Sequence, residues 1–139
     1  MTLSSRVYSL ITSCVLVSGA LAAPTDTHDL DVDGITARRG AVVLFGSPAS
    51  CSQPGSVQLR KLQRRTPEWK TIRVEGVREG TARHDLLTTR MNERITRAAR
   101  FAASDRGCDC VLRKSDILDA RGKTIRDLTD DVIAQLSRV

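Results

Sequence analysis

The chain has 139 residues, the length of one ordinary domain, and its 22 Lys and Arg against 16 Asp and Glu give a formal net charge of +6. A hydrophobic fraction of 40% supplies enough side chains for a core and argues against a wholly disordered chain. Aromatic residues make up only 3%, which argues against a single-stranded nucleic-acid binder and against an aromatic-lined pocket for a small molecule.

The first 22 residues have the pattern of a secretory signal peptide. Their start is basic, residues 7–17 are mostly apolar, and an Ala-Leu-Ala sequence precedes a cleavage site before Ala23. The apolar run is too short to be a good membrane span. We therefore expect an exported protein. One alternative stays open, because residues 11–14 (ITSC) look like a lipoprotein box that would attach a lipid to Cys14.

Residues 23–54 are interpreted as a flexible leader and linker. The first part of this stretch is acidic and polar and has no apolar period. Within it, residues 41–45 (AVVLF) are apolar and partly β-branched between two glycines, which predicts one extra strand. The sequence that follows, SPASCSQPG, has the composition of a loop.

A helical arm is expected over residues 67–106. Thr66 is a suitable N-cap, and a proline occupies the first helical position. Gly76 and Gly80 weaken the middle of this stretch and mark either a turn between two helices or a close approach of helices. Before the arm, Val57–Leu59 alternates apolar and polar residues and predicts a short strand.

The second half of the arm carries an apolar stripe opposite a basic face. The stripe has steps of three and four residues and consists of Leu87, Met91, Ile95, Ala98 and Ala102. Such a stripe is more typical of core or subunit contacts than of contacts with another protein. Gly107 follows the last helical turn and suits a C-terminal cap.

The remaining sequence predicts two strands and a final helix. We expect a strand over Cys108–Leu112, whose two cysteines share one face with Leu112, and a second strand at Ile117–Leu118. The final helix covers Asp130–Ser137, with Thr129 as its cap and acidic residues in its first turn.

This order of elements resembles the end of the Skp/OmpH family of periplasmic chaperones. The family closes with a helix, a D-x-V-x strand, a second strand and an acidic D-[IL]-T-x-x-V-[IL] helix, and here these elements fall on Asp109–Leu112, Ile117–Leu118 and Asp127–Ile133. The resemblance covers residues 90–139. A weaker match at Val57–Ile72 looks like the first strand and the start of the ascending helix, and an alternative places that strand at Ala41–Phe45.

The resemblance implies an α+β fold with a small β body, a coiled-coil-like helical arm and a C-terminal helix. In that arrangement the family domain is 55–139, with the body at 55–66 and 107–139 and the arm at 67–106. It also implies a homo-oligomer, as a trimer, that acts as an ATP-independent holdase for unfolded outer-membrane and other envelope proteins. The arm here has only about 40 residues, ~60 Å even as one unbroken helix. This length puts in question the client cavity that the family's longer arms enclose.

The residues expected to contact clients or other subunits lie on the arm: Trp69, Ile72, Leu87, Met91, Ile95, Arg90, Arg94 and Arg97. No catalytic residue, cofactor or metal is expected. His84 and Asp85 are not interpreted as a catalytic dyad, because they are adjacent on a helix and should not face each other. Most basic residues are interpreted as a solvated face. The functional alternative is a positive surface that attracts acidic clients, anionic lipid or a lipopolysaccharide-like surface, formed by Arg60, Lys61, Arg64, Arg65, Arg90, Arg94, Arg97, Arg100, Arg113 and Lys114.

A second function class stays open: a non-enzymatic structural or adaptor module of the cell envelope that binds a folded partner or an anionic surface. Three cysteines follow the signal peptide, at Cys51, Cys108 and Cys110. We interpret Cys108 and Cys110 as small core residues. A disulfide with Cys51 is the first alternative, and a metal site, which would need about four ligands, is the second.

Overall fold

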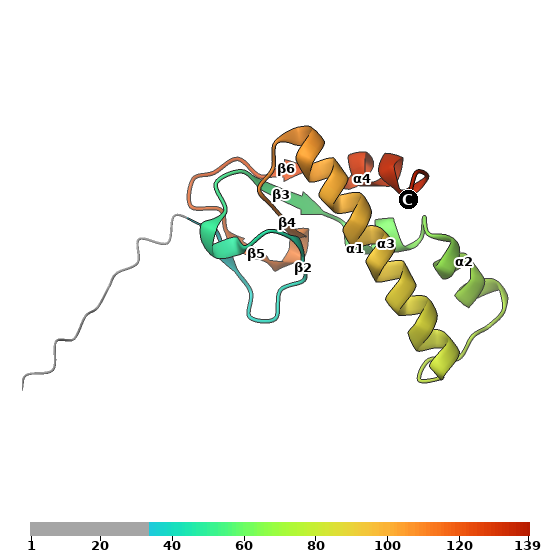
Figure 1. Cartoon of the computed structure of the whole chain (residues 1–139). Helices are drawn as coiled ribbons and strands as arrows, with labels where there is room; N and C mark the ends of the chain where they lie inside the picture. Colours follow the sequence, from blue (N-terminus) through green and yellow to red (C-terminus); the bar gives the residue numbers. More distant parts are fainter. Residues whose placement is uncertain (1–33) are drawn as a thin grey trace, which may run out of the picture.

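The computed structural model describes residues 34–139, so the expected signal peptide, Cys14 and the acidic start of the expected leader lie outside the described residues. The fold is α+β, with a small β body, a helical arm and a C-terminal helix (Figure 1). In chain order the elements are β1 (Thr36–Ala37), β2 (Val43–Phe45), a 3-10 turn η1 (Pro48–Ser50), β3 (Pro54–Val57), α1 (Leu59–Gln63), α2 (Pro67–Val74), α3 (Ala82–Arg106), β4 (Cys110–Arg113), a 3-10 turn η2 (Lys114–Asp116), β5 (Ile117–Asp119), β6 (Arg126–Asp127) and α4 (Thr129–Leu136).

A mixed sheet with the strand order β2-β4-β3-β6 forms the centre of the body. Strand β3 pairs in parallel with both β4 and β6, while β2 pairs antiparallel with β4. Two neighbouring parallel strands need a long crossover connection, and here α1, α2 and α3 together form it. Strands β1 and β5 pair separately in a small antiparallel sheet.

The sheet separates two apolar clusters. Strand β4 contributes to both, because its side chains alternate: Val111 points to the helices, and Cys110 and Leu112 point to the opposite face. On that opposite face they pack with Ile35 and Cys51 from the N-terminal segment. The helical side is the larger cluster, in which α3 and α4 cover the sheet through Ile95, Ala98, Ala102, Val132 and Leu136.

Helix α3 begins and ends at the residues that capping chemistry favours. The Thr81 hydroxyl accepts a hydrogen bond from the His84 amide at 3.2 Å. Gly107 ends the helix with φ of 66°, a left-handed conformation that glycine adopts readily. Met91, Ile95, Ala98 and Ala102 of the predicted stripe are buried, whereas Leu87, farther along the arm, is half-buried. The amphipathic helix predicted from the stripe is therefore confirmed.

The arm is a hairpin of two helices. Thr66 caps α2 as predicted, because its hydroxyl accepts from the Trp69 amide at 3.3 Å. Gly76 and Gly80 lie in the connection to α3 with φ of 61° and 78°, so they form a turn between helices. Figure 1 shows α3 extending from the body and α2 lying beside its outer part.

The expected linker is too long, and the first strand of the body is misplaced. Residues 35–54 form β1, β2 and η1 and belong to the body, because Ile35, Leu44 and Cys51 cover apolar parts of the sheet. The strand expected at Val57–Leu59 is wrong in position: β3 ends at Val57, and α1 begins at Leu59. Alternation over three residues is too short a pattern to separate the end of a strand from the start of a helix.

Two details of the C-terminal region also differ from expectation. Thr129 does not cap α4 with its side chain; instead the Asp127 carboxylate accepts from the Thr129 amide at 3.0 Å. The Thr129 hydroxyl accepts from the Gln58 amide at 3.0 Å and so joins α4 to the end of β3. Cys108 does not share a face with Cys110, because it precedes β4 and packs against the helices.

Candidate functional site

Two ion pairs hold α2 against α3 and define the arm. Near the body, Arg94 of α3 contacts the buried carboxylate of Glu68 at 3.1 Å and also donates to the main-chain oxygen of Val139. Near the tip, Arg83 of α3 pairs with Glu75 at the end of α2. The arm is therefore a braced hairpin, and its outer surface is built from the exposed side chains of both helices.

The structure divides the eight expected contact residues into three groups. Met91 and Ile95 are buried in the core of the body, with 3% and 0% of their surfaces exposed, so they serve packing. Arg94 is engaged by Glu68. The other five keep some accessible surface: Trp69, Ile72 and Leu87 are half-buried, and Arg90 and Arg97 are exposed.

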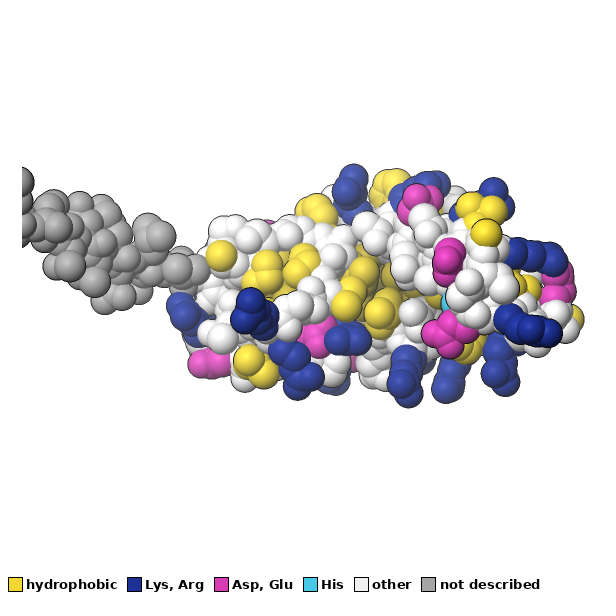
Figure 2. Space-filling view, turned by 90° about the horizontal axis from the view of Figure 1, so that it is seen from below, with side chains coloured by type: hydrophobic (Ala, Val, Ile, Leu, Met, Phe, Trp, Pro, Cys, Tyr) yellow, Lys and Arg dark blue, Asp and Glu magenta, His cyan; other side chains and the backbone are white. Residues whose placement is uncertain are grey.

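The outer part of the arm exposes two apolar side chains that the sequence analysis did not single out, and Phe101, 51% exposed, is a third nearer the end of α3. Val74 at the end of α2 is 77% exposed, and Leu86 in the second turn of α3 is 50% exposed. Neither belongs to the core stripe, so the stripe gave no signal for them. Figure 2 shows one face of the molecule, with apolar side chains across its middle and Lys and Arg side chains around its edges.

The second candidate surface is a groove that runs from the body to the arm, here named the cationic groove. It consists of three adjoining hollows. The first, about 660 Å³, lies at the carboxyl ends of β3 and β4, the second lies over α1, and the third lies between α1 and α2 beside Trp69. The groove is lined by eight cations: Arg60, Lys61, Arg64, Arg65, Lys70, Arg73, Arg113 and Lys114.

Neighbouring hollows share lining residues, so they adjoin one another. The first and second share Gln58, Arg60 and Lys61, and the second and third share Arg64 and Arg65. No Asp or Glu lines any of the three. Six of the eight cations belong to the basic set identified in the sequence, but no local pattern in the sequence indicates that they lie close together.

Three of the groove cations have acidic partners outside the lining. Lys61 lies 2.8 Å from Asp130, and Lys114 lies 3.6 Å from Asp127. Arg113 donates to both carboxylate oxygens of the fully buried Asp116. Hydrogen bonding from Arg113 holds the pKa of the Asp116 carboxyl below its ordinary value, with help from the Val42 amide.

The other five groove cations have no acidic partner among the described residues. In the described part of the chain, 34–139, the structure records no ion pair or side-chain hydrogen bond for Arg60, Arg64, Arg65, Lys70 or Arg73. The groove therefore keeps positive charge that the fold itself does not compensate, and like charges held this close repel one another. An anionic ligand would relieve that repulsion.

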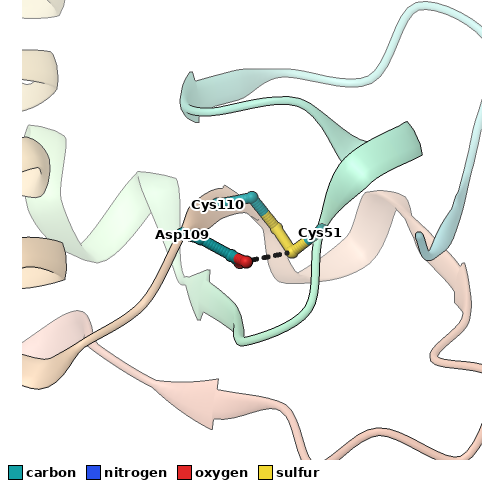
Figure 3. A group of neighbouring side chains, drawn as sticks. All are labelled: Cys51, Asp109 and Cys110. Carbon is teal, nitrogen blue, oxygen red and sulfur yellow. Dashed lines mark hydrogen bonds between the residues drawn. A yellow bond between two sulfur atoms is a disulfide. The ribbon is translucent and has the colours of Figure 1, made fainter. Parts of the chain in front are cut away.

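The cysteines form the third chemically distinctive cluster (Figure 3). Cys51 and Cys110 form a disulfide with a Cα–Cα distance of 5.7 Å, which joins the loop after η1 to β4. The interpretation of Cys110 as a core thiol is therefore wrong, and the alternative disulfide with Cys51 is confirmed. Cys108 is a free, buried thiol, and burial raises its pKa.

Asp109 fixes the loop that carries Cys51. Its carboxylate accepts from the amides of Ser52 and Gln53 at 2.8 and 2.9 Å. Burial raises the pKa of Asp109, but the backbone hydrogen bonds and the charge of Lys123 together outweigh it and lower the pKa. One oxygen also lies 3.2 Å from Cys51 Sγ, a sulfur that carries no proton while the disulfide is intact.

Two other clusters bear on the expectation that the protein binds no metal and catalyses no reaction. Ligand atoms of Cys51, Asp109 and Cys110 lie within 4.8 Å of one another, but a sulfur bonded in a disulfide offers no thiolate to a metal. His84 and Asp85 were expected to point apart, yet His84 Nδ1 lies 3.7 Å from a carboxylate oxygen of Asp85. Both lie in the first turn of α3.

A scan against protein-family models, a search of curated proteins and a search of solved structures each find no match to this chain. Within residues 34–139, no helix combines the length and the apolar character that a membrane crossing requires.

Proposed function

We propose that the protein is an exported, ATP-independent holdase that binds unfolded envelope proteins and catalyses no reaction. The observation that supports this proposal is the arm, a braced hairpin that exposes Val74 and Leu86 and keeps Trp69 half-buried. A contiguous exposed apolar patch marks an interaction surface, and we propose that these side chains contribute to one on the arm. The resemblance of residues 90–139 to the Skp/OmpH family points to the same function.

The length of the arm favours binding on its surface. Helix α3 has 25 residues, ~37 Å of axis, and its last turns are used to cover the sheet. The remaining hairpin is short, so one copy of this chain cannot surround an unfolded protein. We propose that clients are held by several weak contacts along the arm, and that the protein self-associates to present several arms, as a trimer by resemblance to the family.

The test is suppression of aggregation by the purified, oxidised protein. A urea-unfolded outer-membrane β-barrel protein is diluted into increasing amounts of it, and turbidity is followed at low and high salt. We expect suppression that saturates at a fixed stoichiometry. No suppression at large excess would refute the holdase and leave the adaptor that binds a folded envelope partner.

Matched variants locate the activity on the arm. The double variant Val74→Ser, Leu86→Ser removes two exposed apolar side chains of the arm, and we expect it to need several times more protein for the same suppression. The control Leu118→Ser, Ile125→Ser makes the same chemical change at two exposed positions of the body, 61% and 37% exposed. Equal losses in both variants would show that general surface hydrophobicity, and not the arm, holds the client.

A further inference from the structure

We infer that the cationic groove is a binding site for an extended, acidic segment of polypeptide. In this assignment the segment lies along α1, with one end beside the arm and the other at the carboxyl ends of β3 and β4. The inference rests on the proposed function and deepens it, because it names the class of client sequence that the protein selects.

Charge is the first support for this assignment. Eight cations and no acid line the groove, and five of the eight have no side-chain partner within residues 34–139. The exposed face of α3 differs, because the hollow there that contains Arg97 and Arg100 also contains Glu93. Uncompensated positive charge is thus a property of the groove and not of every basic surface of the molecule.

The shape of the groove favours a chain over a compact anion. Helices α1 and α2, which border it, contain 5 and 8 residues, which sets an upper length of about 20 Å if their axes are laid end to end. An extended polypeptide advances ~3.3 Å per residue, so about six residues cover this distance. A single phosphate or carboxylate group would occupy only one of the three hollows.

Apolar side chains at both ends of the groove favour a polypeptide over a bare polyanion. Trp69 and Val74 line the hollow at the arm, and the half-buried Leu59 lines the hollow at the strand ends. Between them, Gln58 and Gln63 offer amide groups that can donate to and accept from a main chain. A segment with apolar residues on both sides of an acidic run matches this order.

The floor of the groove is held rigidly by the body. The Gln58 amide donates to the Thr129 hydroxyl at 3.0 Å, and the Leu128 amide donates to the Ser56 carbonyl at 2.8 Å. Ser56 and Leu62, which precede and follow residues 57–61 in the sequence, are buried. The cations of α1 are therefore presented from a fixed base, which lowers the ordering cost of binding.

The test uses the oxidised full chain and a synthetic peptide with about six glutamates between leucines, the length worked out above. Trp69 is the only tryptophan of the chain, so a change in its emission reports occupation of the arm end of the groove. Anisotropy of a fluorescein-labelled copy measures affinity independently. We expect the peptide to bind, to bind less tightly in high salt, and to bind about tenfold more tightly than the same peptide with glutamine in place of glutamate.

Charge-reversal variants distinguish the groove from net charge. Arg60→Glu, Arg64→Glu changes two unpartnered groove cations, and we expect about a tenfold loss of affinity. Arg39→Glu, Arg100→Glu makes the same change in net charge at exposed arginines outside the groove, and we expect a loss below about twofold. Equal losses would overturn the site, as would binding that leaves the emission of Trp69 unchanged.

Two further results separate this inference from its rivals and from the proposed function. Binding to phosphatidylglycerol vesicles that depends on Arg60 and Arg64, without binding of the peptide, would overturn it in favour of a lipid surface. If the peptide binds in the groove but no client is kept from aggregating, the holdase proposal fails while the acidic-segment site stands. If aggregation is suppressed equally by wild type and by the groove variant for acidic clients, the holdase stands and the inference fails.

Discussion

Removing the Cys51–Cys110 disulfide should destabilise the body strongly. The two cysteines are 59 positions apart, so the disulfide closes a long loop that includes α1, α2 and α3. In the chain-entropy treatment, closing a loop of this length lowers the entropy of the unfolded chain by about 14 cal/mol/K, equivalent to about 4 kcal/mol at 25 °C. Measured losses are commonly smaller, so we expect about 2–4 kcal/mol for Cys51→Ser, Cys110→Ser.

The structure also predicts which part of the body loses stability first when the disulfide is removed. The disulfide attaches the segment that carries Ile35 and Cys51 to one face of the sheet, and that cluster contains few other buried side chains. The helical face has a much larger cluster and does not depend on the disulfide. We therefore expect the N-terminal segment to separate first, which exposes surface before the main transition and lowers the apparent m-value.

The assay is urea unfolding followed by far-UV circular dichroism, with and without reductant. Wild type should lose stability on reduction, and the double serine variant should match reduced wild type in both conditions. Cys108→Ala is the control, because Cys108 is a free thiol in the other cluster, and this variant should stay sensitive to reductant. Equal midpoints for oxidised and reduced wild type would refute the reasoning.

Three further substitutions test the packing, the buried charge and a tight turn. Ile95→Ala should cost about 2–5 kcal/mol in urea unfolding, because Ile95 is fully buried; a loss below about 1 kcal/mol would contradict the assigned core. Arg113 holds the pKa of Asp116 below its ordinary value, so the stabilisation from this pair is complete above about pH 4 and is lost as pH falls through the lower pKa of the folded state. Asp116→Asn should remove that part of the pH dependence, which urea midpoints from neutral to acid pH would show; an unchanged profile would exclude Asp116 as its source. Gly46→Ala should destabilise, because φ is 70° there and a Cβ would lie 2.1 Å from the carbonyl oxygen of Asp109; a thermal midpoint equal to wild type would contradict that close approach.

The helices could be predicted because their signals are local. Thr66 and Gly107 mark helix ends by their own chemistry, and the stripe through Met91 and Ile95 repeats often enough to define a face. The strands carry less information. Strand β3 reads PGSV, and only its pairing with β4, far away in sequence, makes it a central strand.

The candidate sites likewise depend on contacts between residues that are far apart in the sequence. Arg60 and Arg113 appear as separate basic residues in the sequence, and only the parallel pairing of β3 with β4 brings both to one hollow. The spacing of the cysteines likewise left core, disulfide and metal interpretations open, because the decisive fact is that Cys110 faces the segment that contains Cys51. Both the shared hollow and the disulfide therefore arise from contacts between residues far apart in the sequence, which composition does not reveal.

The arm is an insertion between two strands that are immediate neighbours in the sheet, β3 and β4. Its far end, the turn between Glu75 and Thr81, lies away from the sheet, and its glycines have open space around them. Whole helical turns added or removed at this point leave the strand register, both apolar clusters and the disulfide untouched. The length of the arm can therefore change while the body stays the same. Matching helical turns inserted into α2 and α3 at this turn would lengthen the arm on an unchanged body.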